Sequence, residues 1–217
     1  TISSGGSLTV EPGGVLSNTS ISSGGTINGF TLAQNISCAS GINIWNATVA
    51  GEARVTSDQA ATGITVLTGG AMRVEESGFT SMTTVRTGGV LEVAGGKAVL
   101  TTVLVDGTMI VSSGGSTSSA TLSGGVMSLG SGGIADWTEA HTGGRVVLSG
   151  GTARNTQVES GGSVTMLDGI AMATEISAGG VMENFATVNF TILSSGGVLV
   201  VSSGHANGAI VYSGGMV

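Results

Sequence analysis

The densest group of residues that could do chemistry lies in the second half of this 217-residue chain, where carboxylates, a histidine and an arginine recur at a regular spacing. The group consists of Asp136, Glu139, His141, Arg154, Gln157, Glu159 and Glu175. Paired carboxylates could cleave a glycosidic bond, since one protonates the leaving group while the other attacks or activates water. Whether these residues can act together depends on the elements that hold them.

A short repeat runs along the whole chain and is marked by glycine pairs, as in the stretch TGGVLEVAGGKA, Thr87 to Ala98. After the first pair, apolar and polar residues alternate, which is the period of a β-strand. After the second pair, a small residue, a threonine and an aliphatic residue recur. Glycine suits the corners because it adopts positive φ without steric cost. We expect a ladder of inward-facing residues that includes Leu91, Val93, Ala98, Thr101, Val103, Val146, Leu148, Ala153, Thr156 and Val158.

One such unit buries too little apolar surface to fold alone, so neighbouring units must stack. We predict an all-β fold over residues 1–217, a right-handed single-stranded parallel β-helix (β-solenoid) of about 11 coils of 18–19 residues each. The composition agrees. The chain has 40 glycines, 1 proline and 3% aromatic residues, and its mean hydropathy is +0.44. Small aliphatic side chains suit a narrow interior.

One interval departs from the repeat. The interval between the corners at residues 24 and 50 is clearly longer than every other one, and it contains AQNISCASGINIW, Ala33 to Trp45. We expect an inserted loop or hairpin of about seven residues around 33–45 that carries Cys38. Because Cys38 is the only cysteine, it cannot form a disulfide within the chain, and we expect a small buried or half-buried side chain.

Stacking places equivalent residues of neighbouring coils about 4.8 Å apart. Asp136 should then lie beside Arg154, and His141 beside Glu159. Such pairs are typical of ion pairs and hydrogen bonds on a polar face.

Glu139 and Glu175 should lie two coils apart, at about 10 Å, which exceeds the carboxylate spacing of retaining glycosidases and reaches only the upper end of the inverting range. We therefore expect no catalytic site and no enzyme. His141 and His205 stand on distant coils, which gives no metal-ligand spacing, and the calcium-binding nonapeptide repeat is absent. We expect no metal and no cofactor.

The charges argue against nucleic acid as a partner, because 6 basic residues stand against 13 acidic ones, the net charge is −7 and no basic cluster occurs. No stretch approaches the ~20 apolar residues of a membrane span, so we expect no membrane insertion of this segment. The first residues do not have the pattern of a signal peptide.

The order of a Ser-Gly-Gly corner, a short apolar strand, a second glycine corner and Ala-x-x-Thr-x-Val resembles the strand-loop-strand repeats of AIDA-type self-associating autotransporter adhesin passengers. The best matches are SGGTARNTQVESGGSVTM, Ser149 to Met166, and AGGKAVLTTVLVDGTMIV, Ala94 to Val111. The resemblance covers nearly the whole chain and departs from the pattern around Cys38 and at ENFATVNF around Phe185.

The resemblance implies a bacterial cell-surface or extracellular passenger, exported through an outer-membrane translocator that this chain does not include. It further implies self-association between cells, aggregation or biofilm formation, or attachment to a host surface or glycan. We therefore expect the segment to be a fragment of a longer passenger. A heptosyltransferase that modifies Ser and Thr is an implied partner, with Thr102, Ser118 and Ser177 as outward candidates. Two alternatives stay open, a β-helix that binds or cleaves polysaccharide and a passive stalk.

Overall fold

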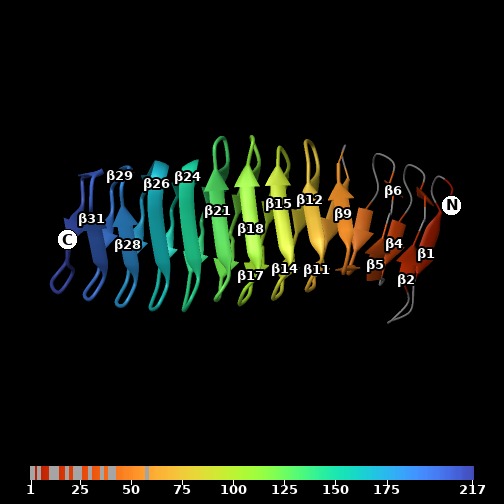
Figure 1. The fold of residues 1–217 in the computed structure, drawn as a ribbon, viewed down its shortest axis with the longest axis horizontal. Coiled ribbons are helices and arrows are strands. Elements are labelled where there is room, and N and C mark those ends of the chain that lie inside the picture. The colour runs from red at the N-terminus through yellow and green to blue at the C-terminus, as the bar shows by residue number, and fades with distance from the viewer. Residues whose placement is uncertain are drawn as a thin grey trace.

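The computed structural model is an all-β parallel solenoid in which successive coils stack along one long axis, with the two chain ends at opposite ends of the stack (Figure 1). Residues 43–56 and 59–217 are described in full, together with residues 3 and 6–9. A further five stretches are described only as strands, at 15–17, 20–21, 26–28, 31–34 and 37–38. All pairings between the described strands are parallel, and each joins equivalent positions of neighbouring coils, as Val90 pairs with Thr108.

Each coil contributes strands to three faces. The first face contains β9 (Glu52–Val55), β12 (Ala71–Val74), β15 (Val90–Ala94), β18 (Thr108–Ser112), β21 (Val126–Gly130), β28 (Val181–Asn184) and β31 (Val198–Val201). The second face contains β1 (Ser7–Thr9), β4 (Thr26–Asn28), β7 (Asn43–Trp45), β10 (Ala60–Thr62), β13 (Phe79–Ser81), β16 (Lys97–Val99), β19 (Ser116–Ser118), β22 (Ile134–Asp136), β29 (Thr187–Asn189) and β32 (His205–Asn207). The strands β24 (Arg145–Arg154) and β26 (Ser163–Met172) run through the corner and belong to both faces. Together these strands form one 19-stranded sheet.

The third face is a separate 12-stranded sheet, with one strand from each coil. Its members are β2 (Val15–Ser17), β5 (Thr31–Gln34), β8 (Thr48–Val49), β11 (Thr65–Val66), β14 (Thr84–Val85), β17 (Thr102–Val103), β20 (Thr121–Leu122), β23 (Glu139–Ala140), β25 (Gln157–Val158), β27 (Glu175–Ile176), β30 (Ile192–Leu193) and β33 (Ile210–Val211). A 2-stranded sheet pairs β3 (Ser20–Ile21) with β6 (Ser37–Cys38). The 12 described strands of the third face mark 12 passes of the chain, so the number of coils differs slightly from the expected 11.

Stacked aliphatic side chains form the core, and like lies above like. Leu91 stacks on Met109, Met109 on Met127 and Met127 on Val146, one coil at a time. All ten residues of the predicted inward ladder are at most 2% exposed, which confirms that part of the repeat analysis. A short two-residue strand such as β17 therefore contributes one core residue and one surface residue per coil.

The glycine pair before each first-face strand has two separate structural roles, as Gly161 and Gly162 show. Gly161 has a φ of +75°, a conformation that L side chains rarely adopt. A Cβ on Gly162 would instead collide with the backbone carbonyl oxygen of Ala140 in the coil before. In another coil, Asp106 replaces the first glycine at a φ of 55°, while Gly107 is retained. Close stacking of the coils, and not only the turn, therefore requires the second glycine.

A third corner, between the second and third faces, carries positive φ on residues that are mostly not glycine. We call these ten stacked residues the corner column: Asn46, Gly63, Met82, Leu100, Ser119, Trp137, Asn155, Ala173, Phe190 and Gly208. Their φ angles are 49–69°. Corner amides bond to the next coil, as Trp137 N–H does to the Arg154 carbonyl at 3.0 Å. This series of hydrogen bonds between coils holds the backbone of the corner residues in the left-handed region, at a cost of about 1–2 kcal/mol per non-glycine residue.

The strand register contradicts the predicted insertion at 33–45. Strand β7 pairs with β4 on one side and with β10 on the other, at Thr26↔Asn43 and Asn43↔Ala60, so the two register steps are equal and neither contains extra residues. Strand β4 follows the glycines at 24 and 25 and belongs to the second face, whereas residue 50 precedes β9 of the first face. The two positions that the sequence analysis compared, 24 and 50, are therefore different corners of the coil. The chain between them covers about one and a half coils, and this accounts for its length without an insertion. The side chain of Cys38 lies outside the described residues.

Candidate functional site

The predicted polar face forms across three neighbouring coils, because the solenoid register brings its members side by side. Asp136 at the end of β22 pairs in register with Arg154 at the end of β24. Their side chains approach to 3.8 Å between Oδ1 and Nη1, and both are well exposed. This confirms the predicted neighbours. An exposed pair at this distance contributes little, on the order of 0–1 kcal/mol.

His141 sits between two carboxylates on the same face. Its Nδ1 lies 2.9 Å from Glu159 Oε2 in the next coil, and its Nε2 lies 3.4 Å from Glu139 Oε2 in its own coil. The carboxylates can only accept when ionised, so a neutral His141 donates to one of them and a protonated His141 to both. The predicted contact between His141 and Glu159 is confirmed. The contacts hold Glu139 and Glu159 in a hydrogen-bonded network.

The two carboxylates considered as a catalytic pair are separated by a full coil. Glu139 pairs in register with Gln157, and Gln157 with Glu175, so these three form a row along the outside of the third face. A glutamine between them leaves no direct contact between the carboxylates. The row continues a ladder of threonines toward the N-terminus, where Thr121 precedes Glu139 in register. What the structure shows here is a hydrogen-bonding surface.

The sequence analysis missed Trp137, which the fold places at the centre of this polar face. Trp137 belongs to the corner column and is 59% exposed, between Asp136 on the second face and Glu139 on the third. Its signal in the sequence was its position, one residue after each second-face strand. There six of the ten described coils carry a small residue or asparagine and four carry a large apolar one, and a repeat alignment of the third corner would have revealed those four.

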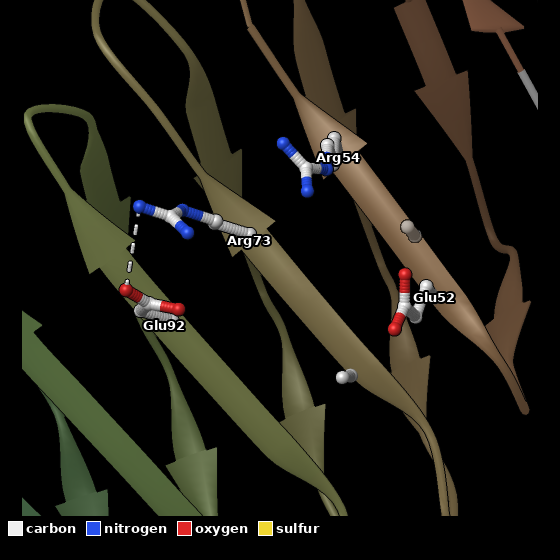
Figure 2. Close-up of a pocket in the computed structure, with 6 residues that line it drawn as sticks. Glu52, Arg54, Arg73 and Glu92 are labelled. Carbon is white, nitrogen blue, oxygen red and sulfur yellow. Dashed lines mark ion pairs between the residues drawn. The ribbon is translucent and has the colours of Figure 1, made fainter.

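A second cluster of charge, also missed, lies on the first face around a shallow hollow (Figure 2). Arg54 and Arg73 are neighbours in register on β9 and β12, and both contact Glu75 Oε1 at 3.2 Å. Arg73 also lies 3.6 Å from Glu92, the pair that Figure 2 marks with a dashed line. The two like charges are therefore held side by side by carboxylates. The hollow is lined in addition by Glu52 and Ala53, and both of its arginines are already paired with carboxylates.

Within the part of the chain that the structure describes, no group of three or more His, Cys, Asp or Glu side chains could hold a metal ion. In the same residues, no helix is long and apolar enough to cross a membrane.

Among the solved structures that are similar to this chain, a fragment is similar along almost its whole length. It is a hyper-glycosylated fragment of TibA, modified in a reaction that TibC catalyses, with a TM-score of 0.60 and 30% sequence identity over 97% of this chain and 91% of the fragment. No protein-family model matches the sequence, and no curated protein matches it. The shared solenoid, the identity and the coverage of both chains place this protein in the family of TibA-like autotransporter adhesin passengers.

Proposed function

We propose that this chain is part of a bacterial cell-surface adhesin and joins cells to one another, or to a host surface, through the flat faces of its solenoid. The observation that carries the proposal is the similarity to an adhesin passenger over 97% of the chain. The faces suit contact with another surface, because the third face carries a row of threonines that Glu139, Gln157 and Glu175 continue over several coils. The repeat allows many weak contacts to add up.

Cell clumping tests the proposal. The chain is fused to an outer-membrane translocator and displayed on non-aggregating cells, and settling of the culture is measured against cells that display the translocator alone. Faster settling, or retention on epithelial cells or abiotic surfaces, is the expected result. If displaying cells neither clump nor attach to any of these surfaces, the adhesin function is refuted.

A passive stalk is distinguished by removing one coil. Deletion of residues 90–107 should leave the fold intact, because Val90 and Thr108 are register partners and Met109 would then stack on Met72 as Leu91 does. If many coils together form the adhesive surface, cells that display the shortened protein should settle more slowly, in proportion to the share of the coils removed. A stalk would keep its adhesion and only shorten its reach.

We further propose that a glycosyltransferase modifies outward Ser and Thr with heptose, as the glycosylation of the TibA fragment suggests. The third face offers an uninterrupted row of half-buried threonines, formed by Thr48, Thr65, Thr84, Thr102 and Thr121. The other two candidates, Ser118 on the second face and Ser177 after β27, are also partly accessible. Intact-mass measurement after co-expression with TibC tests this. An unchanged mass would contradict it.

Polysaccharide cleavage is not supported by the geometry. The carboxylates of the polar face either contact His141, pair with Arg154 or, in the case of Glu175, stand two coils from Glu139. A reducing-end assay on plant and bacterial polysaccharides should therefore show no product.

A further inference from the structure

Trp137 is one of four large, exposed apolar residues in the corner column, with Met82, Leu100 and Phe190. Several coils carry a small residue or an asparagine in the corner column, such as Gly63, Ser119 and Asn155, whereas Trp137 holds a large aromatic ring at a φ of 56°. Its indole is 59% exposed in a chain with only 2 tryptophans. Packing within the fold leaves most of the ring exposed, and exposed tryptophan rings are enriched where proteins contact other molecules.

The indole stands between two depressions of the surface. Toward the N-terminus the first has a volume of about 320 Å³ and is lined by Leu100, Ser119, Thr121, Trp137 and Glu139. Toward the C-terminus the second, of about 130 Å³, is lined by Trp137, Asn155, Thr156, Gln157, Ala173, Glu175 and Ile192. The small side chains of Ser119 and Ala173 leave the space in these coils open. A chain-like ligand that runs along the solenoid axis would therefore pass over the indole and occupy both depressions.

Three polar side chains of the second depression are available to a ligand, whereas Glu139 of the first already contacts His141. The side chains of Asn155, Gln157 and Glu175 make no hydrogen bond or ion pair with any residue that the structure describes. The hollow around Arg54 and Arg73 is the opposite case, because both arginines already contact Glu75 and Arg73 also pairs with Glu92, the pair marked in Figure 2. Of the two regions, the one around Trp137 combines an exposed aromatic ring with free hydrogen-bonding side chains.

This combination matches the chemistry of a neutral saccharide. The C–H groups of a sugar ring carry partial positive charge and stack on the negative face of an indole. The carboxylate and amide groups of Glu175 and Gln157 can accept from and donate to neighbouring sugar hydroxyls. An anionic sugar would be repelled, because Glu139 and Glu175 flank the indole and the chain has a net charge of −7.

We propose that Trp137 and the two depressions beside it form a binding site for a neutral oligosaccharide laid along the solenoid axis. The inference rests on the proposed adhesin function and names one ligand class for it. Trp137 contacts the sugar ring, and Gln157 and Glu175 contact its hydroxyls. Affinity of a single such shallow site is expected in the range of about 0.1–1 mM, and repetition over many molecules on a cell surface raises the avidity.

Indole fluorescence tests the proposal directly. In a Trp45→Phe background, Trp137 is the sole tryptophan of the chain. This protein is titrated with neutral hexasaccharides of glucose, N-acetylglucosamine, galactose and mannose, and with sialylated lactose and a heparin hexasaccharide. A saturable change in emission with at least one neutral sugar, and none with the anionic sugars, is expected. No saturable change with any neutral sugar at millimolar concentrations, or tighter binding of an anionic one, would overturn the proposal.

Variants assign the site, with calorimetry as the readout because Trp137→Ala removes the fluorophore. Trp137→Ala should lower the affinity at least tenfold, and Glu175→Ala severalfold. Alanine fits this corner, since Ala173 has a φ of 55°. Phe190→Ala is the matched control, because Phe190 is an exposed aromatic residue of the same column that lines neither depression. Equal losses for Trp137→Ala and Phe190→Ala would overturn the proposal.

The clumping assay separates this inference from the proposed function. If purified protein binds no neutral sugar while displaying cells clump, the saccharide site is refuted and the adhesin function stands. If protein binds sugar through Trp137 but displaying cells neither clump nor attach, the adhesin function is refuted and the site stands.

Discussion

Replacing Gly70 by alanine should destabilise its corner far more than replacing the adjacent Gly69. A Cβ on Gly70 would collide with the carbonyl oxygen of Val49, which already accepts a hydrogen bond from the Leu67 amide at 2.9 Å. Overpacking costs about 1–3 kcal/mol, and the weakened hydrogen bond contributes up to about 1 kcal/mol more. Together they predict that Gly70→Ala destabilises this corner by roughly 3 kcal/mol. Gly69→Ala meets no atom within 4 Å and pays only for a φ of +77°, a net cost of about 1 kcal/mol.

Hydrogen exchange at the Leu67 amide measures the opening of this ladder bond. Because about 1.4 kcal/mol corresponds to a factor of about ten, Gly70→Ala should speed exchange roughly 100-fold and Gly69→Ala about fivefold. Local exchange is preferred over a melting curve, since a stack of coils does not unfold as one two-state unit. Similar acceleration in both variants would refute the argument that contact between coils, and not turn conformation, requires the second glycine.

Three further predictions concern buried hydroxyls, surface charge and the corner column. Thr138→Val should raise the free energy of unfolding by about 1–3 kcal/mol, because Thr138 Oγ1 is buried without a partner in the described residues. Thr80→Val should instead lower the free energy of unfolding by about 1 kcal/mol, because it removes a donor 3.0 Å from the Ala61 carbonyl oxygen. Both are measured by urea unfolding, and a loss of stability in Thr138→Val would mean that its hydroxyl has a partner. Glu75→Gln should lower the free energy of unfolding by about 1 kcal/mol at low salt and leave it unchanged in roughly 1 M salt, because Glu75 lies between two arginines. A loss of stability that does not depend on salt would contradict this. Ala173→Gly should stabilise the chain by about 0.5 kcal/mol in thermal unfolding, since it relieves a left-handed φ of 55°, and a lower midpoint would show that the corner is not strained.

Much of the fold was predictable because a solenoid repeats its local pattern at every coil. The alternation around Leu91 and Val93 identified a strand, and its repetition at a constant period required a parallel neighbour for it. The predicted neighbours Asp136 and Arg154 followed from the same arithmetic and are confirmed. The arithmetic failed in the N-terminal coils, where glycine pairs mark both of two corners and the sequence does not distinguish them. Only the pairing of β7 with β4 and β10 showed which corner each pair occupies.

The sequence by itself determined the coil, the inward ladder and the row of polar residues on the outside, since each depends only on residue type and on a fixed spacing. The tertiary structure decided what depends on how closely neighbouring coils approach one another. It showed that the second glycine of each pair is required by the carbonyl of the coil before, that the third corner adopts positive φ with or without glycine, and that Trp137 stands between two depressions. These properties arise from contacts between coils. A repeat period predicts which residues of neighbouring coils are paired, but not how closely their atoms approach or how the surface between them is shaped.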